Sequence, residues 1–275
     1  MPFPKPKDPS ITFLNKYGYN VVRLPRTGIE PMDIVARDEQ DILNLGPIRK
    51  VWSSPIPEPQ PKPPRPTSAV NGMKTDALDV SFGLKVLADA LAAFGVSAPS
   101  FNVAYQGAHS VHFAYTNVTT TSVEPFDVGS YLGGNDDDKG ELQTSNPQVT
   151  NYFLNPNAKT YIILDVLKSD SITVSATDSN GVGVTLDVPA IQGVVGANVA
   201  VKPSSSSSSE VTFTGPAALT FGFAVQQIVR VGDKWVLHGA KPSGNIAFAV
   251  PGARPADAAT PTIFDTGELD CRISI

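Results

Sequence analysis

Hydrophobic and polar residues alternate in many segments of this chain, which is the pattern of β-strands with one buried face. An early strand is predicted over residues 18–26, and Pro25, which has no N–H to donate to a ladder, is expected to stop it. Residues 31–46 are expected to supply a second strand and a connection. Residues 161–201 read as further strands that turn at Asn180 and Gly181, because Asn-Gly favours a tight hairpin with positive φ at both positions.

Two more strands are predicted after this turn. The first has one apolar face, formed by Val182, Val184, Leu186 and Val188. The second has Val195, Ala197, Val199 and Val201 on one face. A later hairpin is expected over residues 219–239, turning at Gly232 and Asp233.

Helix and loop signals frame these strands. Residues 7–18 predict a short helix, with Asp8 as N-cap, Pro9 in the first turn and Gly18 at the end. The Pro-rich residues 53–68 predict an extended connector, and the serine run 204–209 a flexible loop.

Residues 75–95 fit two periods. Read as a helix, they place Leu84, Leu87, Leu91 and Phe94 on one face. Read as a strand, they place Leu78, Val80, Phe82, Leu84 and Val86 on one face. A strand that runs into a helix explains this pattern, and so does a segment that is helical in one state and extended in another. The neighbouring residues 101–121 read as a strand with Val111, Phe113 and Tyr115 facing one way. Each arm has the roughly 9–11 residues that a tilted membrane strand needs.

Composition limits the class of protein. The 275 residues suit one large domain or two small ones, and 41% hydrophobic content allows a sizeable core. The single cysteine, Cys271, excludes an intramolecular disulfide. No apolar run follows Met1 and none reaches 18 residues, so we expect neither a signal peptide nor a transmembrane helix.

Positive charge gathers near the N-terminus. Residues 1–66 carry 10 Lys and Arg against 7 Asp and Glu, and the remainder carries 11 against 19. A basic end on an acidic protein suits contact with an anionic surface, and ordinary solvated lysines explain the same balance.

Catalytic and metal-binding motifs do not assemble. Asp265-Thr266-Gly267 resembles an aspartic-protease loop, but a second such triplet is missing from the sequence. His109 and His112 would point to opposite faces of a strand. The acidic residues 135–140 lack the spacing of a calcium loop. We therefore expect no enzyme activity and no metal or other cofactor.

Several segments, taken in order, resemble the bacterial gasdermins. They are residues 16–38, "LGPIRKVW" at 45–52 before the Pro-rich connector, 74–95, 103–118 and 221–239 before a short tail. The resemblance implies an α+β fold, namely a twisted, mostly antiparallel sheet with peripheral helices and a short C-terminal autoinhibitory tail. It implies a pore-forming domain over residues 1–248, an exposed linker over 249–262 and an inhibitory peptide over 263–275.

The resemblance also implies an activation mechanism. A caspase-like or trypsin-like protease is expected to cut near Val250, Arg254 or Ala258 and to release a tail anchored by Phe264, Leu269 and Ile273. The cytoplasmic protein would then oligomerise with copies of itself and insert into the anionic inner membrane as β-strands. It would thereby kill the host cell in defence against phage. Nucleic acid is not an expected partner.

Particular residues follow from that expectation. The membrane strands are expected to present Val80, Phe82, Val111, Phe113, Val182, Val184 and Leu186 to lipid. The headgroups are expected to meet Lys5, Lys7, Lys16, Arg23 and Arg26. The chain departs from the family in one respect, since "MPFPKPKD" lacks the N-terminal cysteine that bacterial members acylate. Acylation is therefore not carried over.

Two other functions compete with this one. A non-enzymatic β-rich binding or assembly protein would share the low charge and the Ser/Thr-rich strands. A hydrolase with an unrecognised site is the third hypothesis. Liposome leakage before and after proteolysis would separate the first function from the other two.

Overall fold

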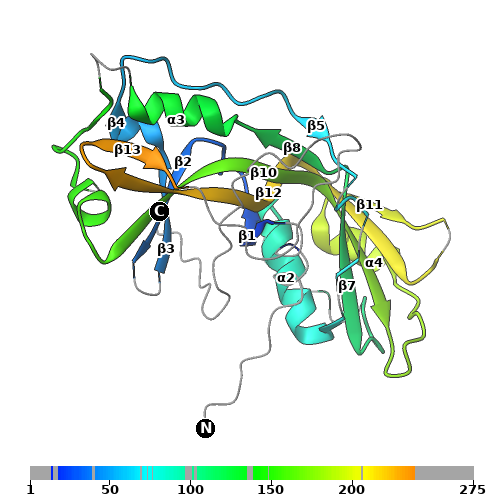
Figure 1. Ribbon diagram of the computed structural model, residues 1–275. Helices are drawn as coiled ribbons and strands as arrows, with labels where there is room; N and C mark the ends of the chain where they lie inside the picture. The colour runs from blue at the N-terminus through cyan, green and yellow to red at the C-terminus, as the bar shows by residue number, and fades with distance from the viewer. Residues whose placement is uncertain are drawn as a thin grey trace, which may run out of the picture.

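The computed structural model describes residues 14, 18–38, 41–68, 70–72, 74–75, 77–96, 101, 104–134, 139–147, 149–205 and 207–238. Two very long strands cross the whole molecule and carry the other elements on either side (Figure 1). They are β10 (Ala158–Thr177) and β12 (Glu210–Val231), and they pair with each other antiparallel. All the described strands except β4 and β9 therefore belong to one sheet built on this central pair.

The remaining strands are short. They are β1 (Asn20–Arg26), β2 (Asp33–Asp38), β3 (Asp41–Pro47), β4 (Trp52–Ser53), β5 (Arg65–Pro66), β6 (Leu78–Asp79), β7 (Ser110–Thr116), β8 (Thr119–Ser122), β9 (Glu141–Leu142), β11 (Ala200–Pro203) and β13 (Lys234–Leu237). The helices are α2 (Val80–Ala93), α3 (Pro125–Gly133) and α4 (Val188–Val195), with a 3-10 turn η1 (Ile48–Lys50) and a π-helical turn η2 (Val149–Phe153).

The sheet is antiparallel throughout its described pairings. Its central path runs β1-β12-β10-β2-β3; beyond β2, strand β8 pairs with the middle of β10 and β7 with its far end. Strands β11 and β13 pair with opposite ends of β12, and β6 pairs with β7. The predicted fold class, a mostly antiparallel sheet with peripheral helices, is confirmed.

The core is divided between the two ends of the long strands. At one end, α3, β13 and η2 enclose a cluster that includes Trp52, Tyr131 and Phe153. Trp235 packs edge-on against both Trp52 and Phe153, at ring-centroid distances of 6.3 and 5.8 Å. The other end has its own, larger cluster, described below. Two smaller clusters fill the middle.

Several sequence predictions are confirmed. The hairpin at Gly232 and Asp233 joins β12 to β13, and Gly232 has φ +65°. The connector over 53–68 is extended, with only brief pairing at β4 and β5. The segment 75–95 is a strand that runs into a helix, β6 into α2. The described serines of 204–209 form a loop. Gly18 has φ +83°, although most of the helix predicted before it lies outside the described residues.

Other predictions were wrong. Pro25 does not stop β1, which continues to Arg26 through an irregular register. The connection expected in 31–46 is itself a strand, so β2 and β3 form a hairpin. At the Asn180-Gly181 turn only Gly181 takes positive φ, at +77°. The Asp178 side chain accepts hydrogen bonds from the N–H groups of Asn180 and Val182 and closes a wider turn.

The prediction of two strands after that turn was also wrong. Residues 182–187 have no strand beyond a bridge between Thr177 and Gly183, and α4 occupies residues 188–195. The cause is local capping. The Asp187 side chain accepts a hydrogen bond from the Ala190 N–H at 3.0 Å, and Pro189 suits the first turn of a helix. Only β11 remains of the second predicted strand.

Candidate functional site

The far half of the long strands forms a compact unit, here called the distal lobe, which comprises residues 77–116 and 171–214 where they are described. It lies on the right of Figure 1, where β7, α4 and β11 surround the ends of β10 and β12. Among the described residues, its core draws on these two segments and, beyond them, on Leu219. A unit with its own core can open while the rest stays folded.

Helix α2 covers the apolar side of this lobe. Asp79 caps it, since its carboxylate accepts a hydrogen bond from the Ser81 N–H at 2.9 Å. The hydrogen bonds from Ser81 and Phe82 lower the pKa of Asp79. Leu87 and Leu91 lie four positions apart, on the same face of the helix, and both are fully buried.

Two glycines permit α2 to approach the sheet. A Cβ on Gly83 would lie 2.0 Å from Val111 Cγ2, so only glycine lets the first turns of α2 rest on β7. At the other end of the helix, a Cβ on Gly215 would lie 2.2 Å from Phe94 Cδ1. The Phe94 ring therefore sits directly on the backbone of β12. The helix is fixed at both ends by backbone contact.

The contact at Gly215 coincides with an irregularity in the long strands. The pairing of β10 with β12 shifts between Ser169 and Ser171, because Ser169 faces Leu219 whereas Ser171 faces Thr214. Three extra residues of β12 bulge out at this point. The distal lobe is thus connected to the rest of the sheet by an interrupted ladder.

The strands of the lobe have one apolar and one polar face. The apolar face points into the lobe core and carries Val111 and Phe113 of β7, Ile172 and Val174 of β10, and Val211 and Phe213 of β12. The opposite face carries hydroxyl groups that bond across the strands. The pairs are Ser171 with Thr214 at 3.0 Å, Thr173 with Thr212 at 2.8 Å, and Ser110 with Thr177 at 2.8 Å.

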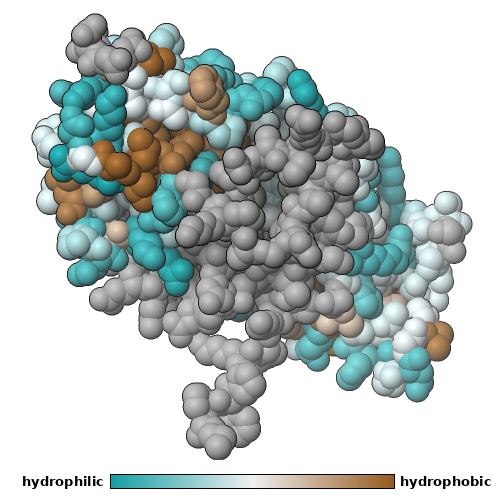
Figure 2. Space-filling model, viewed as in Figure 1, coloured by the Kyte–Doolittle hydropathy of each residue, from teal (hydrophilic) through white to brown (hydrophobic). Residues whose placement is uncertain are grey.

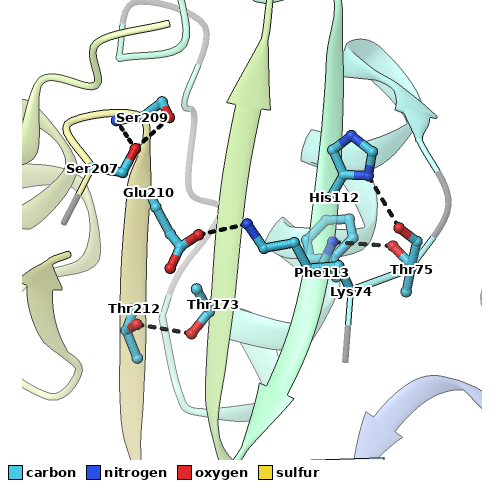
Figure 3. A network of polar contacts seen from close by, with 9 residues as sticks. All are labelled: Lys74, Thr75, His112, Phe113, Thr173, Ser207, Ser209, Glu210 and Thr212. Atoms are coloured by element: carbon cyan, nitrogen blue, oxygen red, sulfur yellow. Dashed lines mark hydrogen bonds and ion pairs between the residues drawn. The ribbon is translucent and has the colours of Figure 1, made fainter. Parts of the chain in front are cut away.

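An ion pair spans this polar face. Lys74 Nζ lies 2.7 Å from Glu210 Oε2, and Figure 3 shows the lysine reaching across β10 toward the start of β12. Beside it, the Thr75 hydroxyl accepts a hydrogen bond from the Phe113 N–H, and the Thr75 carbonyl lies 3.0 Å from His112 Nδ1. The segment before α2 is thereby attached to the edge of β7.

The structure brings the predicted membrane-facing residues together in this lobe. Val111, Phe113 and Leu186 are buried in its core, and Val80 and Val184 pack against it. Phe82 is 38% exposed and Val182 is 62% exposed. In this state the set therefore lies mostly inside the protein. The view in Figure 2 agrees, since the distal lobe presents a mainly hydrophilic surface and apolar surface gathers at the β13 end.

Other predicted residues are only partly described. Arg26 ends β1 and is partly buried, and Arg23 lies in β1. Three predicted headgroup residues lie outside the described residues, namely Lys5, Lys7 and Lys16. The predicted cleavage residues Val250, Arg254 and Ala258 and the tail anchors Phe264, Leu269 and Ile273 also lie outside them.

Sequence reasoning missed two features of the lobe. One is the contact of Phe94 with Gly215, which no local pattern announces because the two residues are far apart in the chain. The other is Tyr105, whose ring is buried against Phe101 at a centroid distance of 6.2 Å. Burial raises the pKa of Tyr105. The alternating pattern of 101–121 was a usable signal for it.

In the part of the chain that the structure describes, His, Cys, Asp and Glu do not gather in threes as a metal site requires. No helix among the described residues combines the length and apolar character needed to cross a membrane.

Comparisons with known proteins converge. The family model described as the Bacterial Gasdermin Family matches residues 22–241. A relative named Gasdermin bGSDM, from Vitiosangium sp. (strain GDMCC 1.1324), is 39% identical over an alignment of 267 residues that covers 95% of this chain and 96% of the relative. A second, from a Desulfuromonadales bacterium, is 30% identical over 261 residues, covering 94% and 96%.

A solved structure shares the fold. The structure of a bacterial gasdermin from Bradyrhizobium tropiciagri superposes with a TM-score of 0.63 at 18% sequence identity, over 84% of this chain and 90% of that one. The antiparallel sheet and its helices therefore have a known counterpart.

Proposed function

Because the chain belongs to the bacterial gasdermin family, which is pore-forming rather than catalytic, we propose that it is an autoinhibited pore-forming protein. Proteolytic removal of the C-terminal peptide releases the body of the protein. The body then oligomerises and inserts into the membrane as β-strands, and the resulting pore kills the cell in anti-phage defence.

One observation carries this proposal. The residues that would meet lipid are gathered in a distal lobe with its own core, attached through an interrupted ladder at Ser169 and Ser171. Inside the lobe, a sheet with one apolar and one hydroxyl-lined face already exists. Insertion requires that lipid replace the helices as the cover of the apolar face. Pairing of the backbone within and between chains satisfies the hydrogen bonds that lipid cannot.

The register of the long strands supports a hairpin in the second segment. Ser175 faces Glu210, and continuing that register beyond Thr177 pairs Val184 with Val201 and Leu186 with Val199. The turn then falls in the middle of α4. A strand conversion of α4 would therefore bring matching apolar residues opposite one another on one face.

The partners of the proposed function follow from charge. Lys5, Lys7, Lys16, Arg23 and Arg26 would approach anionic phospholipid, at about 1 kcal/mol per residue near the surface. The uncut protein would be cytoplasmic, and the cut protein would act on the inner membrane. Copies of the chain are the other partners in the pore.

The activating partner is a caspase-like or trypsin-like protease that cuts within residues 249–262, near Val250, Arg254 or Ala258. The released peptide, 263–275, is held by Phe264, Leu269 and Ile273. Each large apolar side chain contributes roughly 1.5–3 kcal/mol when fully buried, which ordering of the backbone largely offsets. A peptide held so weakly dissociates once its covalent link is cut.

The test uses the full chain with a recognition sequence for a site-specific protease inserted within 249–262. Dye-loaded liposomes containing phosphatidylglycerol are mixed with the protein, with and without that protease. Leakage is expected only after cleavage, and liposomes of neutral phosphatidylcholine should leak much less. The matched control carries a scrambled recognition sequence of the same composition.

Two results would refute the proposal. One is a cut protein that stays folded and releases no dye from either kind of liposome, which would favour a non-enzymatic β-rich binding protein. The other is equal leakage from the uncut protein, which would remove the autoinhibition.

A further inference from the structure

Tyr105 buries a polar hydroxyl group in the core of the distal lobe. The side chain is only 3% exposed, and its hydroxyl has no hydrogen-bond partner in the described structure. A phenylalanine would make the same edge-on contact with Phe101 without burying an unpaired hydroxyl. The hydroxyl therefore does not stabilise the lobe as it is folded here.

Phe82 shows the opposite anomaly. It belongs to α2, in the helix that covers the lobe core, yet it is among the few large apolar side chains of the described residues that are exposed. The folded lobe therefore leaves an apolar ring exposed and a polar hydroxyl buried. A second arrangement of residues 78–116 that suits both residues would have to place Phe82 away from water and the Tyr105 hydroxyl near it.

The structure already contains the start of such an arrangement. Strand β6 pairs antiparallel with β7, with Leu78 facing Val111 and Asp79 facing Ser110. The ladder continues one step further, because the Val80 N–H donates to the His109 carbonyl at 3.1 Å. It stops only where α2 begins.

Continuing this register residue by residue defines a hairpin. Phe82 comes to face Gly107, Leu84 comes to face Tyr105, and the turn falls at Phe94 and Gly95. Gly95 already has φ +86°, which suits a tight turn. Gly107 also has positive φ here, and as a glycine it can become extended at little steric cost.

The two faces differ in polarity over the part of the hairpin formed by residues 78–85 and 105–115. Alternation gives one face Leu78, Val80, Phe82, Leu84, Tyr105, Gly107, His109, Val111, Phe113 and Tyr115. The other face receives Asp79, Ser81, Gly83, Lys85, Gln106, Ala108, Ser110, His112 and Ala114, and only nearer the turn does it also receive Leu87 and Leu91. The first face has no Asp, Glu, Lys or Arg. Phe82 would also lie across Gly107, where an aromatic ring covers the gap that glycine leaves in a strand.

From this register we infer that Tyr105 and Tyr115 are the two interfacial aromatic residues of the first membrane hairpin; the inference rests on the proposed function. They share the lipid face and are ten residues apart, which is about 33 Å along a strand. At a tilt of about 40° this spans about 25 Å, the height of the apolar band between the aromatic girdles of a membrane barrel.

The assignment explains the buried hydroxyl. At the membrane–water boundary a tyrosine keeps its ring in the apolar region and its hydroxyl bonded to water or lipid carbonyls. Leaving the lobe core therefore gives Tyr105 the partner it lacks in the uncut protein. The unpaired hydroxyl weakens the closed lobe and favours the inserted one.

The first test is Tyr105→Phe in the full chain with the inserted cleavage site. Removing an unpaired buried hydroxyl should raise the unfolding temperature of the uncut protein by about 2–4 °C. After cleavage, dye release should be several-fold slower than for the wild type. Tyr19→Phe is the matched control, because its hydroxyl bonds Asp165, and it should not gain stability.

The second test measures depth. In a Cys271→Ser background, a single cysteine at position 105 or 111 is labelled with a fluorophore after cleavage on liposomes. Lipids brominated near the glycerol should quench the label at 105 most strongly, and lipids brominated near the chain end should quench the label at 111.

The outcomes separate the inference from its premise. If the cut wild type leaks but Tyr105→Phe gains no stability, or the label at 105 is quenched as deeply as that at 111, the assignment of Tyr105 is wrong. If the cut wild type does not leak at all, the proposed function itself fails.

Discussion

At the scale of single residues, Asp165 is the most unusual carboxyl group of the sheet. It lies in β10 next to β8, and its carboxylate accepts a hydrogen bond from the Thr120 hydroxyl at 2.5 Å and another from Tyr19. Burial raises the pKa of Asp165 to about 6, more than these hydrogen bonds lower it. The ionised form of Asp165 therefore lowers the stability of the folded protein. The group lies beside Tyr19, which precedes the first strand of the sheet.

Asp165→Asn should therefore stabilise the uncut protein near neutral pH. A carboxyl group whose folded pKa is raised makes the protein less stable as pH rises from about 4 through about 6, because the folded state must then lose a proton that it binds more tightly than the unfolded state. The amide keeps an acceptor for Thr120 and cannot ionise. At pH 8 the variant should gain up to about 3 kcal/mol over the wild type.

The check is chemical denaturation of both proteins at pH 4, 6 and 8. The gain should shrink to less than about 1 kcal/mol at pH 4, where the folded-state carboxyl is protonated and the unfolded-state carboxyl is only about half ionised. A gain that does not change with pH would show that the ionisation of Asp165 is not its cause.

At the scale of elements, the pattern of the chain predicted strands better than it predicted where helices interrupt them. The strand-into-helix reading of 75–95 was correct, because Asp79 is a strong N-cap and Leu87 and Leu91 repeat at helical spacing. The strand reading of 182–188 was wrong, although Asp187 and Pro189 offered the same kind of signal. The prediction for this segment followed its alternating apolar residues and not the capping signal. No local feature shows whether a strand or a helix packs on the lobe core there.

The contacts that fix α2 could not be predicted at this scale. Gly83 meets Val111 and Phe94 meets Gly215 across wide sequence separations, and a glycine in a helix or strand pattern indicates only a possible close approach. The division of the core into a distal lobe depends on such contacts. The predicted site residues were nonetheless brought together, because alternation marks the same apolar face whether a helix or lipid covers it.

Val182→Asp tests the second hairpin without disturbing the folded lobe. Val182 is 62% exposed, so the charge should change the stability of the uncut protein by less than about 0.5 kcal/mol. On the lipid face of a strand, close to the membrane boundary, a charge costs up to about 1 kcal/mol. Dye release after cleavage should therefore fall by up to about fivefold.

The matched control is Thr185→Asp, an exposed position on the predicted water face, which should leak like the wild type. Asp178 and Asn180 precede Val182 on its face and are expected to lie at the membrane boundary. Equal leakage from Val182→Asp and Thr185→Asp would place this segment outside the membrane.

At the scale of the whole molecule, the two ends of the long strands differ in structure. The end with α3, β13 and the two tryptophans has its own aromatic core. The distal lobe holds the segments whose alternation continues through α2 and α4. Under the proposed function, membrane insertion would therefore rebuild only the distal lobe, with β10 and β12 as the shared frame.

A disulfide between α2 and β7 should hold the whole molecule closed even after the tail has gone. The ideal Cβ of Gly83 lies 3.6 Å from the Val111 Cβ, within the range of about 3.5–4.5 Å that a disulfide requires. In the extended hairpin the same two positions would be five residues out of register, about 16 Å apart along the strand. The bond is therefore compatible with the folded lobe and incompatible with the inserted one.

Gly83→Cys with Val111→Cys, in a Cys271→Ser background and with the inserted cleavage site, is expected to be cut normally under oxidising conditions and to release no dye. Adding dithiothreitol should restore leakage to the level of the Val111→Cys single variant, which should leak in both conditions and controls for effects of the reductant. Both cysteines replace residues that touch in the folded lobe, so the oxidised protein should also unfold at a higher temperature than the reduced one. Full leakage from the oxidised, cut double variant would mean that α2 stays on β7 in the pore, and the conversion of residues 78–116 into a membrane hairpin would be wrong.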